Sequence, residues 1–197
     1  MSVNLRFEQA ISAFDSANAQ DPNLEKVDGE KVPHEWIDAK RVAAWVLKLD
    51  PTASEALRLS SRCQHIKRWE IPRTEYPMNR AGYLKWRQDL KAFHAETAGR
   101  ILRDAGYDES LIETVQDLNL KKNLSQGGDV QILEDALCLS FLEFEFGVFL
   151  QNVPEERMVG ILRKTWGKMS DEGRAQALTL SFSGEAKRLI EVALSGG

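Results

Sequence analysis

The stretch VQILEDALCLSFLEFEFGVFL, residues 130–150, decides the fold class of this chain. Apolar residues recur in it at spacings of three and four, which is the period of an α-helix. One stripe contains Ile132, Leu139, Leu142, Phe146 and Phe149, and a second contains Leu133, Leu137 and Phe144. A helix that is apolar nearly all round belongs in the interior of a protein. We therefore expect a central helix over residues 129–151, with other helices packed around it.

The rest of the chain shows the same periodicity between turn signals. We expect further helices over residues 3–17, 33–49, 52–66, 80–105 and 108–121, then helices that begin at Pro154 and at Ser170, and a last one that ends near Leu194. Pro33 suits a first helical turn, and Thr52 with Glu55 forms a capping box. Asp108 and Ser170 are the expected caps of their helices.

The segments between these helices carry loop signals. Residues 20–32 form a polar loop, residues 67–79 contain Pro72 and Pro77 and form another, and residues 121–129 form a turn. No segment alternates with period two, as a half-buried strand would. The sequence therefore predicts a single compact multi-helix domain of the all-α class over residues 1–197.

The composition narrows the functional classes. The chain has 197 residues, is 43% hydrophobic and 28% charged, and carries a formal net charge of -4. This weak acidity argues against bulk nucleic-acid binding, which needs a strongly basic face.

No apolar run approaches the roughly 18 residues of a membrane span, and Arg6 and Glu8 interrupt any signal-peptide core. Cys63 and Cys138 fit reduced core residues, so we expect a cytoplasmic protein. The sequence does not indicate an oligomeric state.

Asp135 lies on the apolar stripe of the central helix. An unpaired buried carboxylate costs several kcal/mol, so it needs a partner. The expected partners are His65, His94, a buried arginine or a cation. His94 lies four residues from both Leu90 and Ala98 and therefore faces the core. A histidine bonded to a carbonyl is the commoner arrangement, so a packed residue and a metal ligand remain alternatives for both histidines.

A basic segment separates the two histidines. Between residues 62 and 91 the chain has eight Lys or Arg residues against three acids. Aromatic residues are interleaved with them, and flat rings beside arginines suit nucleobases or sugars. Lys67, Arg68, Arg73 and Trp69 are the candidate phosphate-binding residues, since guanidinium groups match phosphate geometry. The alternative is a solvated rim whose cations pair with the three acids. Whether the segment containing Lys164, Trp166 and Lys168 joins this rim cannot be derived from the sequence.

Three blocks of this chain resemble the family called domain-of-unknown-function 4202. They are ASEALRLSSRCQHIKRWEIPRTEYPMNRAGYLKWRQDLKAFHAETAGRIL at residues 53–102, LEDALCLSFLEFEF at 133–146 and ILRKTWGKMS at 161–170. The resemblance extends over nearly the whole chain. It implies membership of that family and carries no activity with it.

A more distant resemblance carries a mechanism. The order of elements is similar to the HD-domain superfamily, all-helical metal-dependent phosphohydrolases whose ligands are a His, a His-Asp pair and a later Asp. Asp38 stands at the place of the first His, His65 at the His of the pair, and Asp135 at the late Asp. His94 resembles an additional histidine of some members, and Ile66 replaces the Asp of the pair.

This second resemblance implies an HD-domain-like core with extra C-terminal helices and a divalent ion. Asp38, His65, His94 and Asp135 would hold Mn, Fe or Zn, ions that accept mixed nitrogen and oxygen ligands. Apart from the resemblance, Asp38 could equally be a helix-surface acid. Glu134 either faces solvent or acts as the catalytic base.

Two functions follow as hypotheses. The first is a divalent-metal-dependent phosphohydrolase-like protein that acts on a small phosphorylated or nucleotide substrate. The second is a non-catalytic helical binding module for a phosphate-bearing ligand or a protein partner. Ile66 favours the second hypothesis, because an apolar side chain replaces a ligand. The inward-facing His65, His94 and Asp135 favour the first.

Overall fold

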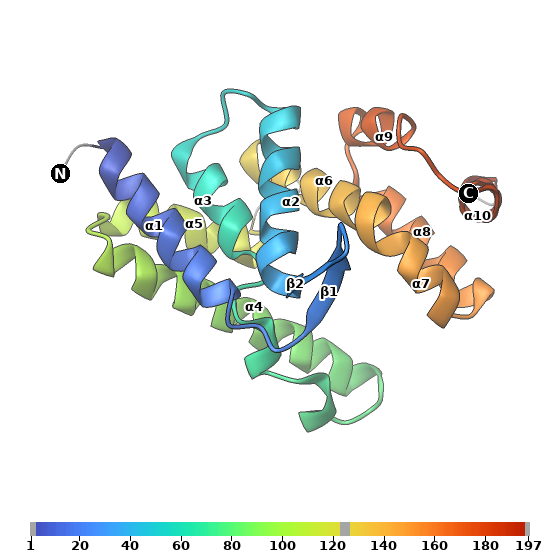
Figure 1. The fold of residues 1–197 in the computed structure, drawn as a ribbon, viewed down its shortest axis with the longest axis horizontal. Coiled ribbons are helices and arrows are strands. Elements are labelled where there is room, and N and C mark those ends of the chain that lie inside the picture. The colour runs from blue at the N-terminus through green and yellow to red at the C-terminus, as the bar shows by residue number, and fades with distance from the viewer. Residues whose placement is uncertain (1–2, 123–126, 196–197) are drawn as a thin grey trace.

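The structure is a computed structural model that describes residues 3–122 and 127–195 and consists mainly of helices (Figure 1). The helices are α1 Val3–Asn18, α2 His34–Leu49, α3 Glu55–Cys63, α4 Arg80–Asp104, α5 Glu109–Leu120, α6 Asp129–Ser140, α7 Phe146–Asn152, α8 Glu155–Lys168, α9 Asp171–Ala177 and α10 Gly184–Leu194. One hairpin, β1 Leu24–Val27 and β2 Glu30–Pro33, lies between α1 and α2. The predicted all-α class is confirmed.

Helix α6 occupies the centre, as its apolar composition predicts. It packs against α2, α3, α5, α8 and α9, and one apolar cluster extends from Ala10 in α1 to Ala193 in α10. Leu133 and Leu139 of α6 are 1% and 0% exposed. Cys63 and Cys138 are buried free thiols, as expected. No helix in the described part of the chain combines the length and hydrophobicity that crossing a membrane requires.

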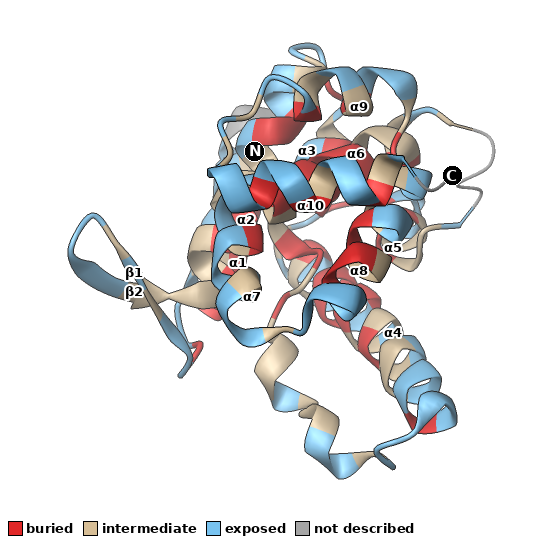
Figure 2. Ribbon diagram, turned by 90° about the vertical axis from the view of Figure 1, so that its right-hand side faces the viewer, coloured by how far each residue is buried: buried red, intermediate tan, exposed pale blue. Residues whose placement is uncertain are grey.

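The hairpin corrects the prediction of a polar loop over residues 20–32. Leu24 pairs with Pro33 and Val27 with Glu30, which leaves Asp28 and Gly29 as a two-residue turn. Their φ angles of 50° and 92° are both positive, and Asp-Gly is a preferred pair for such a turn. The strands have only four residues each, and half of these eight residues are Glu or Lys, so their alternation was too weak to detect. Figure 2 shows the hairpin projecting from the helical body.

Helix α3 also differs from its prediction. Ser54, rather than a Thr52–Glu55 capping box, accepts the hydrogen bond from the backbone N–H of Leu57 at 3.1 Å. The Thr52 hydroxyl instead donates to Asp50. The helix ends at Cys63, before the predicted residue 66.

Two other predicted caps are confirmed. Asp108 accepts from the N–H of Leu111 at 3.0 Å, and Ser170 accepts from the N–H of Gly173 at 3.1 Å. The turn predicted over residues 121–129 lies partly outside the described residues. The loop predicted over 67–79 is present, with two single 3₁₀ turns at Arg68–Glu70 and Arg73–Glu75.

The helix predicted over residues 129–151 is interrupted by a π-turn at Phe141–Glu145, between α6 and α7. Glu143 in this turn accepts a hydrogen bond from the indole N–H of Trp45 in α2 at 2.8 Å. Isolated π-turns occur frequently at functional sites because they redirect side chains. Here the turn brings Phe144 and Glu145 into the wall of a cleft.

Candidate functional site

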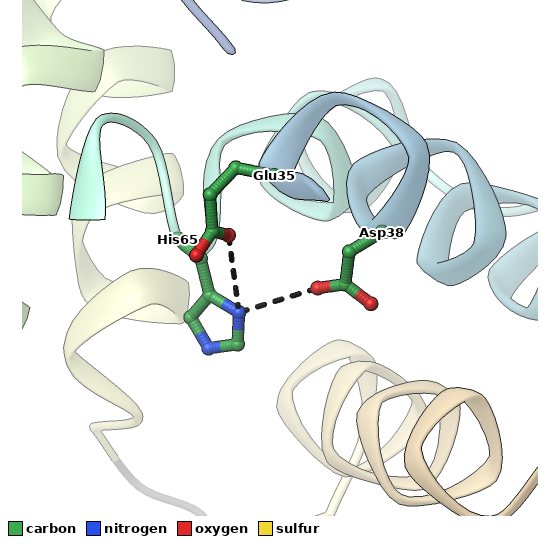
Figure 3. Close-up of side chains that lie close together, drawn as sticks. All are labelled: Glu35, Asp38 and His65. Carbon is green, nitrogen blue, oxygen red and sulfur yellow. Dashed lines mark hydrogen bonds and ion pairs between the residues drawn. The ribbon is translucent and has the colours of Figure 1, made fainter. Parts of the chain in front are cut away.

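Two acids and a histidine lie together where α2 begins and α3 has just ended (Figure 3). Glu35 and Asp38 are three residues apart, so they lie on one face of α2. His65 Nδ1 lies 3.4 Å from Asp38 Oδ2 and 4.0 Å from Glu35 Oε2. One potential ligand atom from each residue lies within 4.8 Å of the other two. We call these three residues the Glu35–Asp38–His65 cluster.

Neighbouring side chains hold this cluster in place. The buried Asp21 carboxylate accepts the backbone N–H of Glu35 at 3.0 Å and that of Asn23 at 2.8 Å. It therefore caps α2 from outside that helix. Ser140 in α6 donates to Asp38 Oδ1 at 3.2 Å. The cluster is thus oriented by the segment after α1 and by the central helix.

Burial sets the protonation states of the cluster. It raises the pKa of Glu35 to about 8, with Arg68 opposing and Asp38 reinforcing the shift. It lowers the pKa of His65 to about 4, although the hydrogen bond with Asp38 acts in the other direction. His65 is therefore neutral near pH 7, and a neutral imidazole is the form that binds metals.

The cluster has the dimensions of a divalent-metal site. Ligand atoms that each lie about 2.0–2.3 Å from one ion are at most about 4.6 Å apart, close to the spacing observed here. The donor set, one imidazole nitrogen and two carboxylates, suits Mn, Fe or Zn. Asp38 and His65 were both predicted as ligands, and the structure brings them together.

The Glu35–Asp38–His65 cluster lies in the wall of a cleft of about 980 Å³. The hairpin, the start of α2, the loop after His65, α4 and α7 all contribute to its walls. The Arg68 guanidinium lies 5.3 Å from the centre of the Trp86 ring and forms no ion pair with an acid of the described chain. Trp69, Phe144 and Phe149 add further aromatic surface. The cleft therefore combines a cationic group with flat apolar walls beside the cluster.

The other predicted phosphate-binding residues have different surroundings. Lys67 forms an ion pair with Glu70 at 2.9 Å and does not line the cleft. Arg73 lines the cleft, but its guanidinium donates to the carbonyls of Tyr76 and Pro77 at 3.0 and 2.7 Å. Part of the basic segment is therefore a rim whose cations are paired within the protein, which was the alternative to phosphate binding. Among the predicted phosphate-binding cations, Arg68 differs from Lys67 and Arg73. Its guanidinium donates no hydrogen bond to an acceptor in the described part of the chain.

His94 lies next to the cluster without belonging to it. Its Nδ1 donates to the carbonyl of Ile66 at 2.8 Å, and its ring centre is 6.1 Å from that of His65. Burial and the neighbouring His65 lower its pKa to about 3. His94 therefore has the packed, carbonyl-bonded arrangement that was the alternative to ligation.

Asp135 is buried, as predicted, but its partners are not the predicted ones. It accepts the backbone N–H of Ser170 at 2.8 Å and the Gln131 side-chain amide at 3.1 Å, and it also accepts the Ser170 hydroxyl. The structure therefore does not bring Asp135 to His65 or His94. The carboxylate is used at the start of α9, where backbone N–H groups need acceptors.

Glu134 does not line the cleft either. It forms ion pairs with Lys121 and with Lys168, the latter at 3.3 Å. These two cations lower its pKa despite burial. Lys168 is thus a partner of Glu134, and neither Lys164 nor Trp166 lines the cleft. Glu134 was predicted as a base beside a metal ion, but it does not lie in the Glu35–Asp38–His65 cluster.

Three acids of the cleft were missed from the sequence: Glu25, which forms an ion pair with Arg41, and also Glu35 and Glu145. Glu35 lies one turn before Asp38, and an acid in the first turn of a helix is common without any site. Glu145 lies in the π-turn and lines the cleft. Burial and the nearby negative Asp38 raise its pKa. The spacing of Glu35 and Asp38 was the available signal, whereas Glu145 had none because a π-turn has no clear pattern.

The comparisons with known proteins give one match. Residues 8–190 match the family described as Domain of unknown function (DUF4202). No curated protein matches the chain, and no solved structure does so either. Because the match extends over nearly the whole sequence, this chain belongs to the DUF4202 family.

Proposed function

We propose that this protein is a divalent-metal-dependent phosphohydrolase acting on a small phosphorylated molecule or a nucleotide. One observation carries the proposal: the Glu35–Asp38–His65 cluster and the unpaired guanidinium of Arg68 line the same cleft. A metal ion and an arginine facing one space are the two groups that phosphoryl chemistry requires most. The HD-domain resemblance predicted the same class.

The residues of the cleft have distinct proposed roles. Glu35, Asp38 and His65 would hold the cation, which when bound polarises a phosphoryl oxygen and acidifies water. Arg68 would bind phosphate oxygens, which match its planar fork of N–H groups. The indole N–H of Trp86 donates to the Ile71 carbonyl at 2.9 Å, so its ring is held in place beside Arg68.

Glu145 is the carboxyl group that we assign to proton transfer in place of Glu134. It lines the cleft, and its raised pKa favours the protonated form that donates to a leaving group. The cleft volume of about 980 Å³ lies at the upper end of the range for small-molecule sites, roughly 300–1,000 Å³. A nucleotide-sized substrate therefore fits the available space.

Elemental analysis tests the metal. The protein should be purified without a chelator or a polyhistidine tag, beside Asp38→Asn and His65→Ala variants. We expect near-stoichiometric Mn, Fe or Zn in the wild type and its loss from both folded variants. Asp135→Asn is the matched control, because this carboxylate lies outside the cluster, and it should retain the metal. Metal-free wild type after reconstitution would refute the site.

Hydrolysis of phosphate esters and nucleotides by the metal-loaded protein tests the reaction. We expect turnover that Arg68→Ala reduces mainly through a higher KM, because the guanidinium binds the phosphate. Unchanged kinetics in a folded Arg68→Ala variant would remove Arg68 from the proposal.

A non-catalytic module that binds a phosphate-bearing ligand or a protein partner is the second candidate. Ile66, which is 0% exposed, directly follows His65 and packs in the core, so no carboxylate lies at this position. A site with one ligand fewer can retain binding without turnover. Saturable phosphate binding by a metal-loaded protein that hydrolyses none of the esters would favour this candidate.

A further inference from the structure

A second, much smaller cavity adjoins the Glu35–Asp38–His65 cluster. Its volume is about 10 Å³, and Glu35, Asp38 and His65 line both this cavity and the large cleft. The small cavity is also lined by Asn18, the last residue of α1, and by Gln64. A volume of roughly 10–15 Å³ accommodates a single water-sized occupant. We call this space the inner chamber.

Two residues that line the inner chamber each have an amide oxygen without a hydrogen-bond partner among the described residues. Asn18 and Gln64 are 1% and 5% exposed, and Asn18 Oδ1 and Gln64 Oε1 are buried without a hydrogen bond in the described structure. The opposite end of each amide fixes its orientation. Asn18 Nδ2 donates to the Arg62 carbonyl at 3.1 Å, and Gln64 Nε2 donates to the Asn119 carbonyl at 3.2 Å. A carbonyl only accepts, so neither amide can turn its oxygen away.

The chamber therefore presents hydrogen-bond acceptors to its occupant. The Ser61 hydroxyl, which also belongs to the lining, donates to the Arg58 carbonyl at 2.7 Å. The remaining polar groups are the two amide oxygens, the Asp38 carboxylate, the ring of His65 and the carboxyl group of Glu35, which is protonated near pH 7 and would release its proton when a cation binds. A water molecule has two hydrogens and satisfies two acceptors, whereas a cation satisfies all of them and offsets the buried negative charge.

We infer that Asn18 Oδ1 and Gln64 Oε1 are ligands of the cation held by Glu35, Asp38 and His65, and that this cation is of the Mn²⁺ class. The inference rests on the metal site of the proposed function and adds its inner ligands. Four oxygens and one nitrogen exceed the usual four ligands of zinc and match the oxygen-rich, higher coordination of Mn²⁺ or Mg²⁺. Of these two ions, Mn²⁺ accepts an imidazole more readily.

Titration of the full-length protein with Mn²⁺ and with Zn²⁺ tests this inference. Asn18→Leu and Gln64→Leu remove the amide oxygens and preserve the approximate side-chain shape. We expect each to weaken Mn²⁺ binding by about tenfold or more and Zn²⁺ binding by less, because zinc needs fewer ligands. Gln116→Leu is the matched control. Its amide donates to the Ala95 carbonyl at 3.0 Å outside both cavities, so its Mn²⁺ affinity should equal that of the wild type.

Three outcomes separate this inference from the proposed function. Wild-type Mn²⁺ affinity in both leucine variants, together with weak binding by Asp38→Asn, would overturn the inner ligands and leave the metal site intact. No metal binding by the wild type would overturn both. Dependence on Asn18 and Gln64 without hydrolysis of any phosphate ester would support the inner ligands and refute the reaction.

A conservative variant keeps the test decisive if Gln64→Leu does not fold. Gln64→Met keeps the length of the unbranched side chain and removes the amide oxygen. We expect it to weaken Mn²⁺ binding by about tenfold or more, as in Gln64→Leu. Wild-type Mn²⁺ affinity in folded Gln64→Met would contradict ligation by this side chain.

Discussion

At the scale of single residues, Asp135 shows how a buried acid can serve the fold. Its carboxylate accepts hydrogen bonds from Ser170 and Gln131. A Cβ atom at Gly173 would lie 2.6 Å from the carboxyl carbon, so the start of α9 must approach Asp135 closely. Asp135 therefore joins α9 to the central helix.

Replacement of Asp135 measures this role. We expect Asp135→Ala to lower the free energy of unfolding by about 2–4 kcal/mol, since it leaves the Ser170 N–H without its acceptor. Glu145→Ala should cost less, because the Glu145 carboxylate forms no hydrogen bond within residues 3–122 and 127–195. Denaturant unfolding of both variants provides the comparison. Equal losses would contradict the capping role.

Glu134 makes stability depend on pH. Burial alone would raise its pKa, but Lys121 and Lys168 lower the folded-state value below the ordinary one. A lowered folded-state pKa stabilises the protein above the unfolded pKa, about 4.3, and this stabilisation is lost as the pH falls through the folded value. We expect Glu134→Gln to be less stable than wild type at pH 7, and the difference to shrink below about pH 4. A difference that stays constant from pH 7 to pH 3 would contradict this linkage.

At the scale of elements, helix caps were predicted well, because a cap depends on residues close together in the sequence. Asp108 and Ser170 cap the helices that they were expected to cap. The hairpin was missed because its strands have only four residues each, although Asp28-Gly29 was a usable turn signal. The burial of Asp135 followed from periodicity. Its partner did not, because Ser170 lies 35 residues later and only tertiary packing brings it close.

The candidate site was predictable in part for the same reason. Asp38 and His65 were named as ligands through the resemblance to the HD-domain superfamily, and they lie 3.4 Å apart. His94 was expected in the cluster but bonds the Ile66 carbonyl. Periodicity shows that a side chain faces inward, but it does not show which inward-facing groups meet. That information depends on how α2, α3 and α4 pack.

Gly82 packs closely against the loop that carries Arg68. A Cβ atom at Gly82 would lie 2.1 Å from the Pro77 carbonyl oxygen, the same oxygen that accepts from Arg73. We expect Gly82→Ala to cost about 1–3 kcal/mol of unfolding free energy and to weaken phosphate binding, because the loop must shift. Gly160→Ala in α8 is the control, since its Cβ meets open space. It should stabilise the protein by up to about 1 kcal/mol, as measured by denaturant unfolding. Equal effects of the two substitutions would contradict the close contact.

At the scale of the whole molecule, the cleft is assembled from segments far apart in the sequence. Residues of the hairpin, α2, the loop after α3, α4 and α7 each line part of its wall. The cluster also depends on Asp21 before the hairpin and on Ser140 at the end of α6. A cation bound there would therefore stabilise several elements together.

Thermal unfolding with added Mn²⁺ measures this coupling. At a free concentration 100 times the Kd, a ligand that binds only the folded state stabilises it by about 2.7 kcal/mol. For a chain of this size that corresponds to a rise in Tm of about 5–10 °C. We expect this rise in the wild type and its absence in Asp38→Asn. An equal rise in both would place the bound Mn²⁺ elsewhere on the protein.

The π-turn at Phe141–Glu145 gives this cleft a sensitivity to chain length. Such a turn accommodates one residue more than regular α-helix, and one residue corresponds to about 100° of rotation about the helix axis. The wider turn absorbs this extra residue, so α7 keeps the face of Phe146 in the core and the face of Val148 and Phe149 at the cleft. Deleting a single residue here would restore a regular helix and leave α7 in place, and it would change which side chains the turn presents to the cleft, now Phe144 and Glu145. A one-codon insertion or deletion in this segment would thus alter the wall of the cleft while keeping every side chain of the Glu35–Asp38–His65 cluster.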